Sequence, residues 1–230
     1  MLGGGTFTAQ NKILPGAYIN FISLAKASAG LSDRGIVTMP LALDWGESNK
    51  VIEITSADFQ KNALKLFGYD YSHAKMKGLR DLFLNAQKLY AYRLNGGGGA
   101  TATCKYATAK YAGTRGNDLK VVIQKNVDDN TKFDVKTVLG TIIVDEQTVK
   151  TASELVDNDF VTYKKTEALA VTAATALTGG TNSDVDGTSY QKYLDKIESY
   201  TFNVMGVATT DDTIKNLVVA FSITQYYSRL

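Results

Sequence analysis

Apolar and polar positions follow a mixed strand and helix pattern between residues 35 and 97. GIVTMPLALDW, VIEIT and KLYAYRL are apolar runs typical of strands, and two stretches with helical spacing lie between the last two. Ser56 and Gly68 suit the start and end of the first helix, and the second begins near Ser72. Pro40 lacks an amide donor, so the second half of the first strand cannot be paired on both sides. This part predicts an α/β segment.

A run of glycines, NGGGGA at 95–100, ends the helical pattern. Short strand candidates separated by turn residues follow it, with the spacing of a small sandwich or barrel. TASE at 151–154 is typical of a capping box between Thr151 and Glu154 that opens one helical turn. The strand candidates are TATCKYATAKYA, LKVVIQKN, KFDVKTVL, TIIVDEQTV, DFVTY and LAVTAATAL. A second loop-rich boundary, LTGGTNSDVDGTS at 177–189, closes the region.

Helical spacing returns after residue 189. TFNVMGVA then predicts a buried strand, and a last helix is capped near Thr210 or Asp211. This piece cannot cover both faces of a sheet alone, so we expect it to complete the first segment, with KLYAYRL and TFNVMGVA as parallel neighbours. The apolar face of the first of these helices comprises Tyr190, Tyr193, Leu194 and Ile197.

The predicted fold class is α/β plus β. A discontinuous, incomplete α/β sheet domain carries an inserted small β-sandwich or barrel, and residues 1–22 form an extended N-terminal arm with too few apolar residues for a core. The α/β domain comprises residues 23–97 and 181–230, and the β-rich insert comprises 98–180. Because the chain stops at ITQYYSRL before the predicted sheet is complete, we expect a shortened version of something longer.

Charge and composition exclude several classes of partner. The net charge is +2 with acids and bases interspersed, so the chain has no basic stripe for nucleic acid. The N-terminus lacks the pattern of a signal peptide, and no apolar run approaches the length of a membrane span. A single cysteine excludes an intrachain disulfide and fits a reducing compartment. We expect a cytosolic product without membrane insertion.

The residues that could act in catalysis or bind a metal are better explained by structural roles. His73, the only histidine, reads as a surface or capping residue, and Cys104 reads as a small half-buried side chain; together they cannot form a His/Cys zinc site. Asp128 and Asp129 lie in a predicted loop, and Asp211 and Asp212 lie at a helix start, where negative charge is favourable.

Asp184 and Asp186 lack the glycine spacing and final glutamate of a calcium loop. We therefore predict no catalytic, cofactor-binding or metal-binding residue.

YAGTRGND at 111–118 leaves two interpretations. Its glycines and arginine suggest a phosphate loop, and hence a nucleotide-binding enzyme, or a tight turn. The glycine spacing matches none of the phosphate-binding motifs, and a strand, LKVVIQ, follows in place of a helix whose N-terminus would attract phosphate. The turn is favoured.

Several segments in fixed order resemble the N-terminal half of a phage tail sheath protein, of the kind found in Gram-positive myophages, defective prophages and phage-tail-like bacteriocins. The resemblance runs over residues 3 to about 221, and YAGTRGND and LTGGT are its most specific segments. The others are GTFTAQNKILPGAYINF, RGIVTMPLALDWG, LYAYRLN, TSYQKYLDKIES and FNVMGVATTDDTIKNLVVAF.

The resemblance implies a mechanical part and no enzyme. Such sheath subunits form stacked hexameric rings around a tail tube, join a baseplate, and contract to drive the tube through the host envelope. It also implies a subtilisin-like central domain, assembly in the bacterial host cytoplasm, and a place in a virion tail or phage-tail-like particle. The N-terminal arm of such a subunit adds a strand to a neighbour, so we expect inter-subunit contacts by Phe7, Tyr18, Ile19 and Phe21.

The sequence departs from this family at its end, where the remaining α/β residues and a C-terminal domain are missing. A truncated gene product, a fragment and a shortened variant with another partner are all compatible with this departure. The alternative function is glycan or receptor binding by the β-rich insert, motivated by its strands rich in Thr and Tyr.

Overall fold

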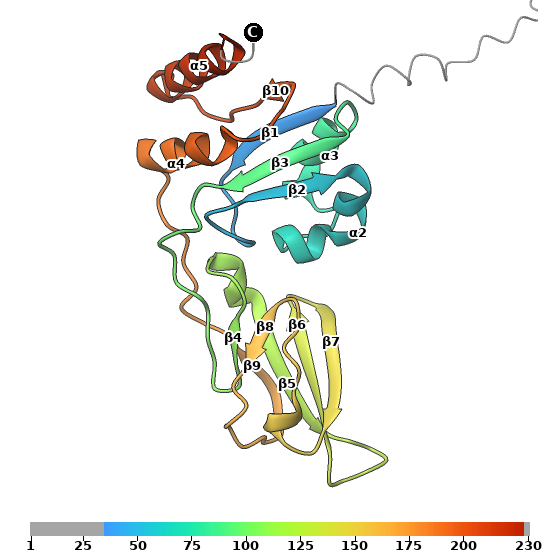
Figure 1. Cartoon of the computed structure of the whole chain (residues 1–230). Helices are drawn as coiled ribbons and strands as arrows, with labels where there is room; N and C mark the ends of the chain where they lie inside the picture. The colour runs from blue at the N-terminus through green and yellow to red at the C-terminus, as the bar shows by residue number, and fades with distance from the viewer. Residues whose placement is uncertain (1–34, 228–230) are drawn as a thin grey trace, which may run out of the picture.

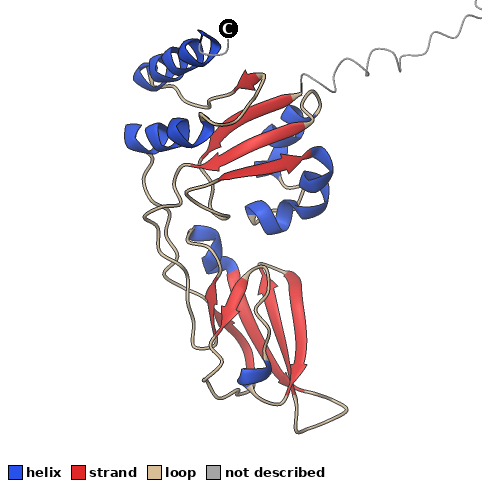
Figure 2. Cartoon of the chain, in the orientation of Figure 1, coloured by secondary structure: helices blue, strands red, loops and turns tan. Residues whose placement is uncertain are grey.

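The computed structural model describes residues 35–227, which form two units joined by two connecting segments. The α/β unit comprises residues 35–94 and 185–227, and the β unit comprises residues 101–178. The connecting segments, 95–100 and 179–184, run side by side between the units (Figure 1). The α-helices lie in the α/β unit, whereas the β unit consists mainly of strands with two short helical turns (Figure 2).

The sheet of the α/β unit has the strand order β10-β1-β3-β2. β1 (Ile36–Leu41) runs parallel to β3 (Lys88–Arg93) and to β10 (Val204–Met205), and β2 (Val51–Thr55) is antiparallel to β3. The prediction that β3 and β10 are neighbours was wrong, because β1 lies between them. The expectation for Pro40 is confirmed: β10 pairs with β1 only at Val37 and Thr38, so Pro40 faces a partner strand only on the β3 side.

Helices cover both faces of this sheet. α2 (Ser56–Phe67), the short turn η1 (Ala74–Met76) and α3 (Lys77–Phe83) pack on one face, and α4 (Gly187–Ile197) and α5 (Asp212–Tyr227) on the other. Because side chains alternate along a strand, Leu89 and Ala91 of β3 contact the first group while Tyr90 and Tyr92 contact the second. The predicted apolar face of α4 is buried as expected.

Helix ends follow their capping residues. Thr55, one residue before the predicted Ser56, caps α2 by accepting from the amide of Asp58, and Gly68 ends α2 at a φ of 75° as predicted. Asp211 accepts from the amide of Thr213 at the start of α5. The second helix was predicted to begin near Ser72, but α3 begins at Lys77 after η1.

The β unit contains two sheets. One has the order β7-β6-β5-β9 and the other pairs β4 with β8. The first comprises β5 (Leu119–Lys125), β6 (Phe133–Leu139), β7 (Ile142–Val149) and β9 (Thr172–Ala176), and the second comprises β4 (Ala107–Ala109) and β8 (Val161–Tyr163). All six predicted strands are present, although TATCKYATAKYA contributes only three residues to β4.

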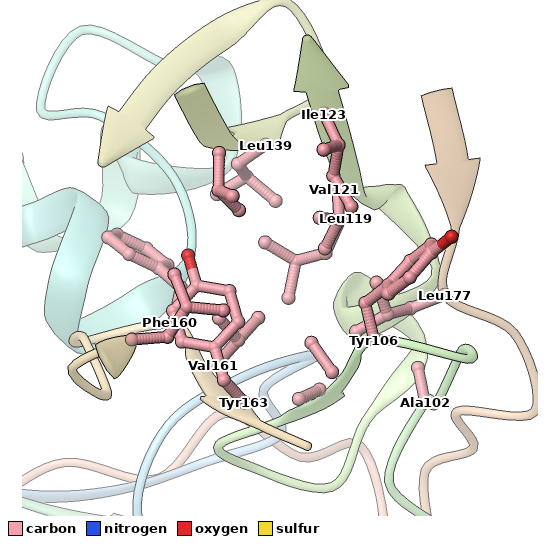
Figure 3. Close-up of a cluster of buried hydrophobic side chains, with 14 of the residues drawn as sticks. Ala102, Tyr106, Leu119, Val121, Ile123, Leu139, Phe160, Val161, Tyr163 and Leu177 are labelled. Carbon is pink, nitrogen blue, oxygen red and sulfur yellow. The ribbon is translucent and has the colours of Figure 1, made fainter. Parts of the chain in front are cut away.

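Side chains of both sheets meet in one core (Figure 3). Leu119, Val121 and Ile123 of β5 are fully buried, and Val161 and Tyr163 of β8 lie across from them. The Tyr163 hydroxyl lies 2.6 Å from the Thr137 hydroxyl, so the polar end of this ring is satisfied inside the core.

The TASE segment forms the short turn η3 (Ala152–Glu154), but the predicted capping box is absent. Glu154 accepts instead from the amide of Lys150, 2.9 Å away, and the Thr151 hydroxyl pairs with Ser153. Between residues 35 and 227, no helix is both long and apolar enough to span a bilayer.

Candidate functional site at the junction of the two units

Trp45 anchors the α/β unit in the core of the β unit. It follows β1, yet its indole is 1% exposed and belongs to the hydrophobic cluster of the β unit. The ring lies 6.0 Å from that of Phe160 in a stacked arrangement and meets Tyr111 edge-on at 5.2 Å. Its Nε1 donates to the carbonyl oxygen of Lys65, so the polar atom is satisfied within its own unit. A large apolar surface therefore joins the units.

Arg93 lies at the end of β3 and is 2% exposed. Its guanidinium donates to the carbonyl oxygens of Gly46 and Ala112, both 2.8 Å away, and these belong to different units. Two weaker bonds reach the side-chain oxygens of Asn95 and Asn182. Burial lowers the pKa of Arg93 to about 10, which leaves it charged at neutral pH. Within residues 35–227, its charge meets only neutral oxygens at hydrogen-bond distance.

Asp44 is a second residue at the junction whose hydrogen bonds connect the two units. Its main-chain oxygen accepts from the amide of Arg115 at 3.2 Å. One carboxylate oxygen accepts from Asn182 at 3.0 Å and from Thr114 at 3.3 Å. The other accepts from the Tyr69 hydroxyl at 2.7 Å and from the Lys75 ammonium group. This carboxylate thus joins its own unit, the β unit and a connecting segment.

The pKa shifts of Asp44, Tyr69 and Lys75, which form one hydrogen-bonded cluster, keep their charge states unchanged around neutral pH. Partial burial by itself would raise the pKa of Asp44, but hydrogen bonds from Lys75, Tyr69 and Asn182 lower it to about 2. The hydrogen bond to Asp44 is the largest cause that raises the pKa of Lys75, and burial raises the pKa of Tyr69. A carboxylate that acts as a general base at neutral pH needs a raised pKa, and a lysine or tyrosine that acts as a nucleophile needs a lowered one. All three shifts here run in the other direction. The cluster is therefore suited to holding structure.

YAGTRGND forms the β unit's side of this junction. Thr114–Asp118 is the short turn η2, and Gly113 before it has a φ of 139°. A Cβ atom at Gly113 would lie 2.1 Å from the carbonyl oxygen of Asp44, so only glycine fits there. Arg115 donates from Nε to the carbonyl oxygen of Gly68 at 2.8 Å and lies 4.5 Å from the ring centroid of Tyr69. The prediction of a turn is confirmed, and its contacts cross the junction.

The same segment has no amides left for a phosphate between residues 113 and 116. The amides of Gly113, Arg115 and Gly116 donate to main-chain oxygens, and that of Thr114 donates to the Asn182 side chain. A phosphate loop needs these donors directed at its ligand. The geometry therefore gives the nucleotide-binding hypothesis no support.

The other candidate residues have the structural roles expected of them. His73 caps η1 by accepting at Nδ1 from the amide of Lys75, 3.2 Å away, and Cys104 is half-buried. Asp129 accepts from Thr131 in the β5–β6 loop, and Asp186 caps α4 by accepting from the amide of Ser189. Residues 35–227 contain no group of three or more His, Cys, Asp or Glu side chains placed to hold a metal ion.

Two further predictions meet different outcomes. The expected arm contacts of Phe7, Tyr18, Ile19 and Phe21 lie outside the described residues. The glycan-binding alternative rested on exposed strands rich in Thr and Tyr, but Tyr106 and Tyr163 are buried in the core. The observation that motivated this alternative is therefore wrong for these two tyrosines.

Sequence reasoning missed the main members of the junction. Asp44, Trp45 and Arg93 had been assigned only to strands, and Asn182 only to a loop. One signal was present: the only charged residue inside the otherwise apolar end of KLYAYRL is Arg93, and a buried arginine needs several acceptors. Trp45 gave no such signal, because the sequence pattern does not show which core an aromatic side chain enters.

Family comparisons match both units in chain order. Residues 34–94 match the tail sheath protein Gp18 domain III N-terminal region, and residues 95–184 match the phage tail sheath protein β-sandwich domain. The second match starts in the first connecting segment and ends in the other.

Two relatives and two solved structures match the chain over most of its length. The chain is 33% identical to the phage-like element PBSX protein XkdK and 32% identical to the uncharacterized protein YqbK, both of Bacillus subtilis strain 168; each alignment covers 96% of this chain and 52% of the relative. The crystal structure of a sheath tail protein of Desulfitobacterium hafniense matches with a TM-score of 0.75 and 39% identity, over 90% of this chain and 48% of that one.

A sheath tail protein of Listeria innocua matches with a TM-score of 0.69 and 33% identity, over 86% of this chain and 47% of that one. The chain therefore spans about half the length of the proteins it matches. Both family matches and both solved structures are described as tail sheath or sheath tail proteins. The chain belongs to the phage tail sheath protein family.

Proposed function

We propose that this chain is a structural subunit of a contractile tail sheath, which polymerises around a tail tube and contracts to drive it through a bacterial envelope. The observation that carries the proposal is the continuous match of both units to sheath tail proteins, with the β unit inserted between β3 and α4. Its partners in this proposal are other sheath subunits, the tail tube protein and a baseplate. Its place is a virion tail or a phage-tail-like particle assembled in the host cytoplasm.

The proposed role is mechanical, and its energy comes from repacking of subunits. The charges at the junction support this role, because Asp44 and Lys75 are each held in their charged form by the other and by Tyr69. We therefore expect no nucleotide-dependent step. Thermal unfolding with and without ATP, GTP or NAD should give the same midpoint, and a raised midpoint with one nucleotide would contradict the proposal.

Assembly is the direct test. The tagged chain is produced together with a full-length sheath protein and its tail tube protein, and particles are purified and imaged by negative-stain electron microscopy. We expect the tag in rings or tubes at a constant ratio to the full-length sheath. A folded chain that sediments only as a free monomer under these conditions would overturn the assignment.

The arm requires a separate control. A variant without residues 1–22 lacks Phe7, Tyr18, Ile19 and Phe21, and we expect it to keep the circular dichroism spectrum of the whole chain while losing incorporation into particles. Equal incorporation of both proteins would contradict the arm contacts and leave the sheath assignment in place.

A further inference from the structure

We propose that the two connecting segments form a rigid splint that holds the α/β unit and the β unit as one body. The splint comprises residues 95–100 and 179–184. Its composition predicts the opposite, because four consecutive glycines at 96–99 are typical of a flexible linker. The inference concerns the internal mechanics of the subunit and does not depend on the proposed sheath function.

Hydrogen bonds tie the two segments to each other along their length. The amide of Thr181 donates to the carbonyl oxygen of Ala100 at 3.0 Å, and the amide of Ala100 donates to the Thr181 hydroxyl at 2.9 Å. Nearer the α/β unit, the amide and the hydroxyl of Ser183 both donate to the carbonyl oxygen of Asn95, and the amide of Gly98 donates to the Ser183 hydroxyl. Chains that freely changed conformation would not keep such reciprocal bonds.

The splint is also bonded to both units. Asn117 of the β unit donates to the carbonyl oxygen of Gly180 and accepts from its amide, both at 2.8 Å. At the other end, the Asn95 side chain accepts from the amide of Leu43 at 2.9 Å. Each end of the splint is thus fixed to a different unit by a buried or half-buried amide side chain.

Close approach explains the glycines better than flexibility does. A Cβ atom at Gly96 would lie 2.3 Å from the Cβ of Ser48, and one at Gly99 would lie 2.1 Å from the carbonyl oxygen of Thr181. Neither position has room for a side chain. Gly98 differs, because a Cβ atom there would meet the Cβ of Ser183 at 3.5 Å, an ordinary contact. Gly98 is therefore a natural control within the same run.

Contacts beside the splint oppose its bending. Arg93 donates to an oxygen of each unit, and the Trp45 indole is buried in the core of the β unit. A hinge motion would expose this indole to water and separate a buried cation from its acceptors, and both changes are costly. Three features thus hold the units together: the two paired connecting segments, the buried indole of Trp45 and the hydrogen bonds of Arg93 to both units.

Amide hydrogen exchange on the unaltered chain tests the splint directly. We expect the amides of Ala100, Thr181 and Ser183 to exchange about a hundredfold more slowly than those of an unstructured peptide, as slowly as the amides of β4 and β8. Exchange at the rate of an unstructured peptide would overturn the proposal. This measurement needs no substitution, so it decides the question even if a variant does not fold.

Two neighbouring substitutions supply the matched test. Spin labels are attached to cysteines at the exposed positions Lys61 and Lys120 in a C104A background, and the distance distribution between them is measured by pulsed electron resonance. We expect one narrow distribution in the parent and in G98A, and a distribution about twice as wide in G99A. A flexible linker would tolerate both substitutions equally, so equal widths in G98A and G99A, or a broad distribution in the parent, would overturn the splint.

Discussion

The indole of Trp45 stacks on the ring of Phe160 with 6.0 Å between centroids, although the two residues belong to different units. We expect W45A to lower the free energy of unfolding by about 3–5 kcal/mol, because it empties a fully buried site and removes the anchor between the units. Urea denaturation followed by circular dichroism measures this loss. V127A is the control: Val127 is 93% exposed, so its replacement should change stability by less than about 0.5 kcal/mol.

A loss below about 1 kcal/mol in W45A would show that the indole contributes little to the junction. Trp45 is the only tryptophan in the chain, so its fluorescence reports the state of the junction in every other variant.

Local features of the fold could be predicted from the sequence, and long-range ones could not. The buried face of α4 follows from side-chain spacing within three turns, and Gly68 ends α2 because the left-handed conformation favours glycine. The strand order was wrong because the apolar pattern of β10 does not show which neighbour the strand takes. The prediction that this strand is buried was also wrong, since Val204 is 56% exposed and Met205 is only partly buried. The glycine run stands out in the sequence, but its close approach to Thr181 depends on a segment about eighty residues away.

The junction was predicted least well for the same reason. YAGTRGND was recognised as a turn from its glycines, but the partners of its arginine and of Gly113 come from Gly68 and Asp44 in the other unit. A turn of this kind gives the same sequence signal whether it faces water or another domain.

The acid stability of the protein should depend on Asp44. Its pKa is about 2 in the folded chain and has its ordinary value, 3.8, when unfolded, so its contribution is fully present above about pH 5 and is lost as the pH falls through 4 toward 2. The shift corresponds to at most about 2 kcal/mol, since the side chain is 26% exposed. D44N should therefore be less stable at pH 7 and should lose less further stability between pH 5 and 2 than the unaltered chain.

The difference between the two proteins isolates Asp44 from the other carboxylates. Urea denaturation at each pH gives this difference, and D128N is the control because Asp128 is exposed and forms no ion pair among the described residues. Parallel acid profiles for D44N and the unaltered chain would contradict the assigned role of the carboxylate.

Gly113 should tolerate no side chain. G113A places a Cβ atom against the carbonyl oxygen of Asp44 and forces a non-glycine residue to a φ of 139°, so we expect a loss of at least about 2 kcal/mol and a lower thermal midpoint. G78A is the matched control, because a Cβ atom at Gly78 in α3 meets nothing within 4 Å and alanine favours helix. Equal midpoints for G113A and G78A would show that the junction can move away from residue 113.

Arg93 should not be replaceable by lysine, although the charge is kept. The guanidinium uses all three nitrogens: Nη1 donates to the carbonyl oxygens of Gly46 and Ala112, Nε to Asn95 and Nη2 to Asn182. A single ammonium nitrogen cannot stand at all three donor positions, and each buried oxygen left without a donor costs about 1–3 kcal/mol. We expect R93K to lower the free energy of unfolding by about 2–4 kcal/mol, with a red shift of Trp45 fluorescence as the junction takes up water. R80K is the control, because Arg80 also donates to two carbonyl oxygens but is half-buried and lies within one unit. If R93K and R80K cost the same and leave the fluorescence unchanged, the clamp between the units does not depend on the geometry of the guanidinium.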